Sequence, residues 1–197
     1  MSADPTGASS LALIVLAAGA GQRFGGPDKL AVPLAGRAVV HHVLATLDPL
    51  RWHQRVLIHR GEPAWCRAFA DAGFTLVRND QPERGMLGSL HLAAQAVQGA
   101  ERALLCLADM PLITSAHILA LLAANREATG QVVASRAGDY RGPPAILPLA
   151  AVRTLPPQGE GGARALLAQA VWVDCDPAQV RDIDTPADLL SIQGSCL

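Results

Sequence analysis

Short apolar runs alternate along the chain with segments of helical period. The strand-like runs are rich in branched apolar residues, and they cover Leu11–Leu16, Arg55–Arg60, Phe74–Arg78, Ala103–Ala108, Gln131–Ser135, Ala145–Leu147 and Val171–Asp174. The helix-like segments cover Val39–Leu47, Glu62–Ala72, Leu87–Val97, Ser115–Arg126, Ala163–Ala170 and Pro186–Ile192. This alternation predicts βαβ units, and hence a three-layer α/β fold with a mostly parallel central sheet.

The third helical segment shows the pattern most clearly. Leu87, Leu90, Ala94 and Val97 recur at helical spacing and predict one buried face. With 197 residues the chain is long enough for one domain with a sizeable core. We therefore expect residues 1–10 to form a flexible leader and residues 11–197 to form a single domain.

A glycine-rich loop follows the first predicted strand. It contains Gly19, Gly21, Gly25 and Gly26, and it carries Arg23 and Lys29. Glycines let backbone N–H groups approach a phosphate closely, and the two cations can pair with a polyphosphate. The loop therefore predicts a nucleotide site.

Two common nucleotide motifs do not fit this loop. The P-loop requires Gly-Lys-Ser/Thr, but Pro27 follows Gly26. The dinucleotide motif G-x-G-x-x-G begins at Gly19 and Gly21, but Phe24 stands at its third glycine. The second predicted strand also ends without the acid that binds a ribose. Both observations argue against a nicotinamide or flavin oxidoreductase.

Composition and charge narrow the class of protein. Half of the residues are apolar and 17% are charged, which is typical of a globular protein. The net charge of −1 gives no electrostatic case for a nucleic acid partner. No apolar run approaches 18 residues, so we expect no membrane association. The four cysteines form no C-x-x-C pair, and Cys106 in a strand-like run is expected to be a buried thiol.

The cytoplasm is the simplest location for such a chain. The alternative is that Leu11–Ala20 is the core of a signal peptide, with Ala18-Gly19-Ala20 as the cleavage site. No Lys or Arg precedes this run, and cleavage would remove the strand before the loop.

Aspartates follow several predicted strands, where open α/β sheets collect their ligands. Asp80, Asp109 and Asp184 are therefore expected at one edge of the sheet. Mg²⁺ prefers one or two carboxylates plus substrate phosphates, and Asp109 is the first choice for a metal ligand. The alternative for Asp109 is a cap for the helix that opens near Thr114.

The C-terminal acids are more ambiguous. Thr185, Pro186 and Asp188 form the pattern of a helix start with a capping box. This leaves Asp182 and Asp184, which point to the same side of an extended segment, so one can bind a metal while the other orients it. The alternative is that both are solvated acids of a loop.

Four segments resemble, in order, the motifs of the MobA/MocA-like nucleotidyltransferases, which activate molybdopterin and related phosphorylated substrates. They are Leu16-Ala17-Ala18-Gly19 through Lys29, Arg78-Asn79-Asp80 with Gly85–Leu90, Asp109-Met110-Pro111, and Asp182–Pro186. The resemblance implies a Rossmann-like nucleotidyltransferase fold and Mg²⁺-dependent transfer of a nucleoside monophosphate to a phosphorylated acceptor such as the molybdopterin cofactor, with release of pyrophosphate. It also implies a molybdoenzyme or its chaperone as a partner.

The resemblance also assigns residues. It implies Arg23, Lys29 and Asp109 as catalytic residues and Asp109 and Asp184 as Mg²⁺ ligands. It implies nucleotide contacts from Leu16, Ala17, Ala18, Gly19, Gly21, Arg23, Lys29, Asn79, Asp80 and Ser89. Ser89 can contact the base or ribose, or it can simply cap its helix.

The Leu16–Gly19 run is similar to the cytidylyl-transferring branch, which implies CTP rather than GTP. Arg141-Gly142-Pro143-Pro144 departs from that branch, which has Gly-His-Pro there. This segment is expected to face the acceptor. Two alternatives remain: an oxidoreductase on the same fold, and a carrier of a pterin or nucleotide without catalytic activity.

Overall fold

The computed structural model describes residues 10–19, 21–26, 28–128 and 130–195. The expected leader therefore lies, apart from Ser10, outside the described residues. The sheet strands are β1 (Ala12–Ala17), β4 (Gln54–His59), β5 (Thr75–Arg78), β6 (Arg102–Leu107), β7 (Val133–Ala137), β8 (Tyr140–Pro148) and β9 (Val171–Asp174). The α-helices are α1 (Val39–Leu47), α2 (Cys66–Asp71), α3 (Gly85–Ala96), α4 (Ser115–Glu127), α5 (Leu149–Thr154) and α6 (Pro186–Ser195).

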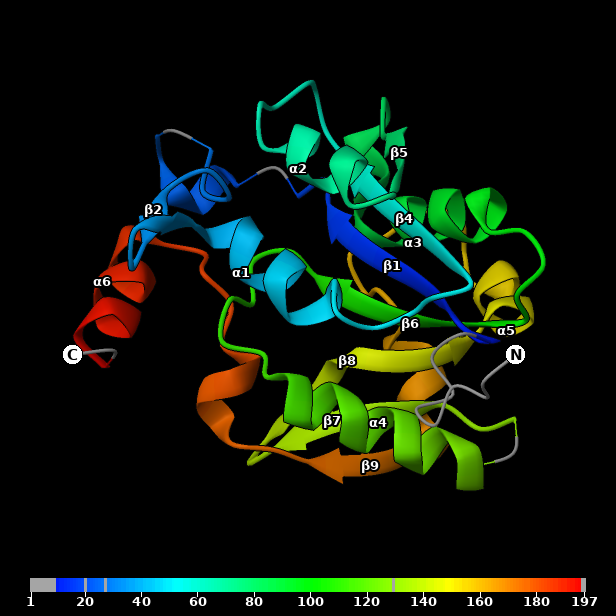
Figure 1. Cartoon of the computed structure of the whole chain (residues 1–197). Coiled ribbons are helices and arrows are strands. Elements are labelled where there is room, and N and C mark those ends of the chain that lie inside the picture. Colours follow the sequence, from blue (N-terminus) through cyan, green and yellow to red (C-terminus); the bar gives the residue numbers. More distant parts are fainter. Residues whose placement is uncertain (1–9, 20, 27, 129, 196–197) are drawn as a thin grey trace.

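The seven strands form one mostly parallel sheet, as expected (Figure 1). Their order is β5-β4-β1-β6-β8-β7-β9. β1 pairs in parallel with β4 and β6, β4 with β5, and β7 with β9, whereas β8 runs antiparallel to both β6 and β7. Because β8 is reversed, its first residues lie at the edge where β1, β4 and β6 end. That edge carries the glycine loop.

Helices cover both faces of the sheet, and the pleat of β1 shows why. Leu13 and Val15 join the core cluster that contains residues of α1, α2, α4 and α6. Ala12, Ile14 and Leu16 join the second cluster, which contains residues of α3 and α5. Since successive side chains of a strand point to opposite faces, an all-apolar strand is required in the middle of three layers.

Most predicted elements are confirmed, with shifts of a few residues at their ends. α2 begins at Cys66 rather than Glu62, because the residue before Pro63 is disfavoured in a helix. The predicted helix at Ala163–Ala170 is a 3₁₀ helix, η4 (Arg164–Gln169), with Leu166 N donating to Ala163 O three residues back. The predicted buried face of α3 is confirmed: Leu87, Leu90, Ala94 and Val97 are all buried.

Several short elements were not predicted. α5 has six residues, too few to show helical period. A small hairpin joins β2 (Pro33–Leu34) and β3 (Arg37–Ala38) before α1, and its turn residues Ala35 and Gly36 both have positive φ. The remaining 3₁₀ helices are η2 (Gln22–Phe24), η3 (Pro82–Arg84) and η5 (Pro177–Val180). Among the described residues, no helix is both long and apolar enough to cross a membrane.

Candidate functional site

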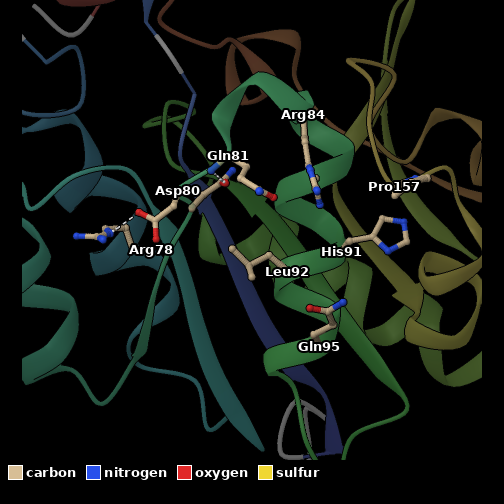
Figure 2. A pocket seen from close by; sticks show the side chains of 10 residues that line it. Arg78, Asp80, Gln81, Arg84, His91, Leu92, Gln95 and Pro157 are labelled. Carbon is tan, nitrogen blue, oxygen red and sulfur yellow. Dashed lines mark hydrogen bonds and ion pairs between the residues drawn. The ribbon is translucent and has the colours of Figure 1, made fainter.

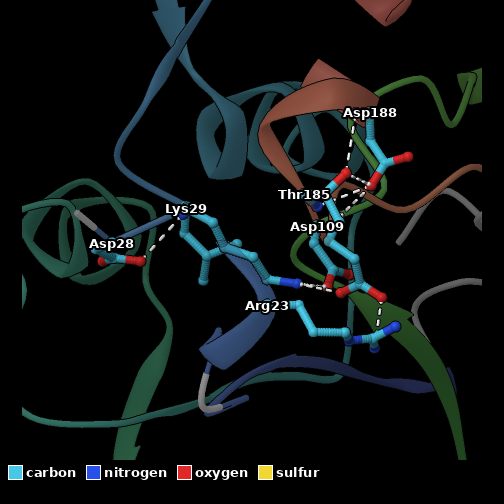
Figure 3. Close-up of polar contacts among 8 residues, drawn as sticks. Arg23, Asp28, Lys29, Asp109, Thr185 and Asp188 are labelled. Carbon is cyan, nitrogen blue, oxygen red and sulfur yellow. Dashed lines mark hydrogen bonds and ion pairs between the residues drawn. The ribbon is translucent and has the colours of Figure 1, made fainter. Parts of the chain in front are cut away.

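The glycine loop after β1 is anchored at both ends. Gly21 and Gly25 flank η2 with positive φ values of 59° and 67°, a conformation that glycine adopts without strain. Phe24 is buried in the core and fixes the middle of the loop. Asp28 accepts hydrogen bonds from Leu30 N at 3.0 Å and from Trp65 Nε1 at 2.7 Å. These contacts hold the backbone on both sides of Lys29 (Figure 3).

Lys29 extends from this loop to two aspartates that are far apart in sequence. Its Nζ lies 2.7 Å from Asp109 Oδ2 and 2.9 Å from Asp184 Oδ1. Arg23 NH2 lies 2.6 Å from Asp184 Oδ2. The Lys29 side chain is 9% exposed, against 76% for Arg23. One buried cation and one solvent-facing cation therefore share two carboxylates (Figure 3).

Electrostatics at this cluster favour charged Lys29 and disfavour additional negative charge. Burial works against the Lys29 ammonium, but contacts with Asp109 and Asp184 outweigh it and raise the pKa. Burial, reinforced by Asp184 and Asp109, raises the pKa of the neighbouring Asp182 carboxyl. The site thus holds more acid than Lys29 alone balances, which makes it receptive to a further cation.

Asp109 retains a free acceptor. Its Oδ1 is buried and has no hydrogen-bond partner among the described residues. The proposal that Asp109 caps α4 is wrong, since the Thr114 side chain accepts from His117 N and performs that role. The expected capping box is present: Thr185 N donates to Asp188 Oδ2 at 2.8 Å, and Asp188 N donates to Thr185 Oγ1 at 3.2 Å. Asp184 is left to bind Lys29 and Arg23, so it is not merely solvated.

A cavity of about 770 Å³ opens above this cluster. Nine of the sequence-predicted residues line it: Leu16, Ala18, Gly19, Gly21, Arg23, Lys29, Ser89, Asp109 and Asp184. Ser89 lies in the second turn of α3 and does not cap it; its Oγ accepts from Asn79 Nδ2 at 3.0 Å. The structure therefore brings together the glycine loop, the D-x-P segment and the C-terminal acids.

Three predicted nucleotide-binding residues lie elsewhere. Ala17 points into the opposite core cluster because it alternates with Leu16 and Ala18 along the strand. Asn79 is buried and lines a second cavity of about 270 Å³ between β5 and α3. Asp80 lines that second cavity as well and pairs with Arg78 at 2.6 Å (Figure 2). Asn79 nevertheless contacts Ser89, which lines the large cavity, and direct contact of Ala17, Asn79 and Asp80 with a nucleotide stays a prediction.

The cavity also contains residues that the sequence analysis did not single out. Arg60 follows β4, and its place directly after a strand could have revealed it. Glu160 comes from the loop before η4, and no sequence signal connects that loop to α3. Tyr140, which begins β8, is not among the residues that line the cavity; burial, and then the charges of Asp182 and Asp109, raise the pKa of its hydroxyl. None of Arg141–Pro144 lines the cavity, and the expectation that this segment faces the acceptor stays a prediction.

Cys106 is fully buried in β6, which confirms the expectation of a buried thiol, and burial raises its pKa. Cys66 is buried as well, and burial followed by Asp28 raises its pKa to about 11. Cys196 lies outside the described residues. Among those described, no group of three or more His, Cys, Asp or Glu side chains could hold a metal. A metal at Asp109 and Asp184 would therefore need oxygen ligands from a substrate.

Curated proteins with similar sequences are named molybdenum cofactor guanylyltransferases. The chain is 31% identical over 121 residues to the "Probable molybdenum cofactor guanylyltransferase" of Haloferax mediterranei, covering 60% of this chain and 57% of that protein. It is 33% identical over 103 residues to the molybdenum cofactor guanylyltransferase of Cereibacter sphaeroides, covering 51% and 50%. The chain thus spans about half the length of these curated relatives.

Solved structures share the fold over nearly the whole chain. Rv0371c from Mycobacterium tuberculosis superposes with a TM-score of 0.77 at 21% identity, covering 94% of this chain and 98% of that one. Molybdopterin-guanine dinucleotide biosynthesis protein A from Archaeoglobus fulgidus gives 0.71 at 20% identity, covering 94% and 98%. A family model for the MobA-like NTP transferase domain matches residues 13–175, which include the glycine loop and Asp109. The chain belongs to the MobA-like NTP transferase family.

Proposed function

We propose that this chain transfers a nucleoside monophosphate from a nucleoside triphosphate to a phosphorylated acceptor of the molybdopterin type. The observation that carries the proposal is Lys29, buried beneath the glycine loop and shared between Asp109 and Asp184 at the floor of one cavity. Nucleotidyl transfer requires positioning and neutralisation of phosphate charge more than covalent help from the protein. A cationic loop beside acids is suited to that task.

A divalent cation fits the acidic side of the cavity. Asp109 has a buried oxygen without a hydrogen-bond partner among the described residues. Asp184 forms an ion pair with Lys29, the lysine that also pairs with Asp109. Mg²⁺ is commonly bound by one or two protein carboxylates, while substrate phosphates supply further oxygen ligands. We infer that Asp109 and Asp184 hold the ion, which would neutralise phosphate charge when bound. The Mycobacterium tuberculosis relative has been solved in a complex with manganese, at 21% identity.

The protein's own groups divide the remaining work. Lys29 and Arg23 bind the triphosphate, and the amides of the loop between Gly19 and Lys29 bind the phosphates that approach the backbone. An oxygen of the acceptor phosphate then attacks the α-phosphorus, a new P–O–P bond forms, and the bond to the β-phosphate breaks. Pyrophosphate leaves from the side of Lys29 and Arg23, whose charge stabilises it.

The base of the nucleotide has two candidates, each with its own support. Guanine is favoured by the relatives, which are named guanylyltransferases. Cytosine is favoured by Ala18, which lines the cavity and whose Cβ narrows the space beside the loop. The relatives' names do not support the expected preference for CTP. Measuring the reaction with GTP and with CTP decides which nucleotide the protein uses.

The test is acceptor-dependent release of pyrophosphate. The full chain is incubated with molybdopterin cofactor, Mg²⁺ and either GTP or CTP, and pyrophosphate and the dinucleotide product are measured. The proposal expects one pyrophosphate per dinucleotide formed. A protein that binds nucleotide and pterin but releases no pyrophosphate would be a carrier rather than an enzyme.

A further inference from the structure

A segment before η4, which we call the strap (Gly159–Gly162), is fastened across the beginning of α3. Gly159 N donates to Arg84 O at 2.8 Å, and Leu87 N donates to Gly159 O at 2.9 Å. These two bonds join the strap to both sides of the first turn of α3. Since Met86 and Gly85 line the cavity together with Glu160, the strap forms part of the cavity wall.

Glycines make this close approach possible. Gly85 has φ of +68°, and a Cβ there would stand 2.7 Å from both Glu160 Oε1 and Gly159 O. Gly162 has φ of +53°, and a Cβ there would stand 2.6 Å from Met86 Sδ. A side chain at Gly85 would press on the Gly159 carbonyl and push the strap away, whereas a side chain at Gly162 would be strained by the positive φ and would displace the flexible end of Met86. The lack of a side chain at Gly85 therefore lets the strap, with Glu160 in it, lie against the first turn of α3.

The Glu160 side chain is exposed and its carboxylate has no hydrogen bond or ion pair with any residue among those described, whereas the backbone of the preceding Gly159 is held by two hydrogen bonds. The Glu160 carboxylate faces a cavity that, on the proposed function, receives a triphosphate and a phosphorylated acceptor. A carboxylate repels phosphates, so it favours binding only where a ligand presents hydrogen-bond donors.

We propose that Glu160 recognises a pair of adjacent N–H donors, of the form HN–C–NH₂, on a bound heterocycle. Two oxygens of one carboxylate match two parallel donors. Guanine carries this pair at N1 and the 2-amino group, and a 2-amino-4-oxopterin carries the same pair at N3 and its 2-amino group. Cytosine has a lone amino group and lacks the pair. The inference rests on the proposed function, because it assumes that a nucleotide and a pterin enter this cavity.

Equilibrium titration calorimetry with GTP, CTP and free pterin tests the proposal. The variants are Glu160→Gln and, as a matched control, Glu83→Gln. Glu83 lies in the same cavity but outside the strap, so its substitution removes the same charge without touching the donor pair. We expect Glu160→Gln, relative to that control, to weaken one ligand about tenfold to a hundredfold, the range for losing a hydrogen bond to a charged group. CTP should change by less than about twofold.

Each outcome decides the question. Selective weakening of GTP assigns the donor pair to the nucleotide, and selective weakening of pterin assigns it to the acceptor. Equal weakening of GTP and CTP, unchanged affinities with only a lower Tm, or a wild-type protein that binds neither GTP nor pterin would overturn the proposal. Failure of the proposed function shows separately, as absent pyrophosphate release by the wild-type protein with molybdopterin cofactor.

Discussion

Replacing Lys29 by Ala tests how the two aspartates are held. The substitution removes the ammonium that lies within 2.9 Å of both carboxylates and leaves Asp109 and Asp184 facing each other. Breaking a fully buried ion pair costs about 3–5 kcal/mol. Here the carboxylates are 20% and 23% exposed, so water partly replaces the lost contact. We expect a cost of about 2 kcal/mol in the free energy of unfolding, a fall of about 4–8 °C in Tm.

The same substitution has a second, opposite effect on metal binding. Without the ammonium, the two carboxylates have only Arg23 to balance them, and Arg23 is largely exposed. Millimolar Mg²⁺ should therefore raise the Tm of Lys29→Ala more than that of the wild type, because a bound ion stabilises only the folded state. Affinity for the triphosphate should still fall about tenfold to a hundredfold through the lost charge-assisted contact.

Thermal unfolding with and without Mg²⁺, and calorimetric titration with GTP and CTP, measure both effects. Lys29→Arg is the control, since it keeps the positive charge while changing its shape. The reasoning would be refuted by a Lys29→Ala variant whose Tm and nucleotide affinity both match the wild type. A variant that loses stability but keeps its nucleotide affinity would leave Lys29 with a structural role alone.

Three further predictions concern the base, the strap and pH. If Ala18 favours cytosine, CTP should raise Tm more than GTP at equal concentration, and Ala18→Gly should narrow the difference, with about 1–3 kcal/mol as the ceiling for one methyl group; a larger effect of GTP on the wild type would refute this. Gly85→Ala should lower the free energy of unfolding by about 1–3 kcal/mol, because of its positive φ and the crowded space for a Cβ, whereas Gly161→Ala, with open space around it, should change it little in denaturant titrations. Burial lowers the pKa of His117, whose Nε2 lies 2.7 Å from Ser135 Oγ, so its contribution to stability should be full above about pH 6.5 and decline as the pH falls towards the folded-state pKa. Urea unfolding between pH 7 and 5 should show a shallower decline for His117→Gln, and an unchanged slope would contradict this.

The sequence predicted the layers of the fold because its periods were unambiguous. The apolar run of β1 predicts a buried strand, and the helical spacing in α3 predicts one buried face. The structure confirms both. The reversed direction of β8 could not be predicted, since antiparallel and parallel strands share one apolar pattern when both faces are covered. The direction matters because it puts the first residues of β8 at the edge where β1, β4 and β6 end.

The site was predicted as far as strand ends determine it. Lys29, Asp109 and Asp184 follow elements that end at one edge, and the structure joins them in one cluster. Asp80 also follows a strand, but it turns into the smaller cavity between β5 and α3 and pairs with Arg78. Glu160 was not predicted, because its position depends on how the strap packs on α3, a contact between distant segments.

The most direct test of the nucleotidyl transfer site compares two aspartates that each follow a strand. Asp109 forms an ion pair with Lys29 in the large cavity, whereas Asp80 lines the smaller cavity between β5 and α3. Pyrophosphate release with nucleoside triphosphate, Mg²⁺ and molybdopterin cofactor is measured for Asp109→Asn and Asp80→Asn. The account predicts that Asp109→Asn abolishes pyrophosphate release while retaining measurable nucleotide binding, and that Asp80→Asn stays near wild-type activity. Full activity of Asp109→Asn would contradict it.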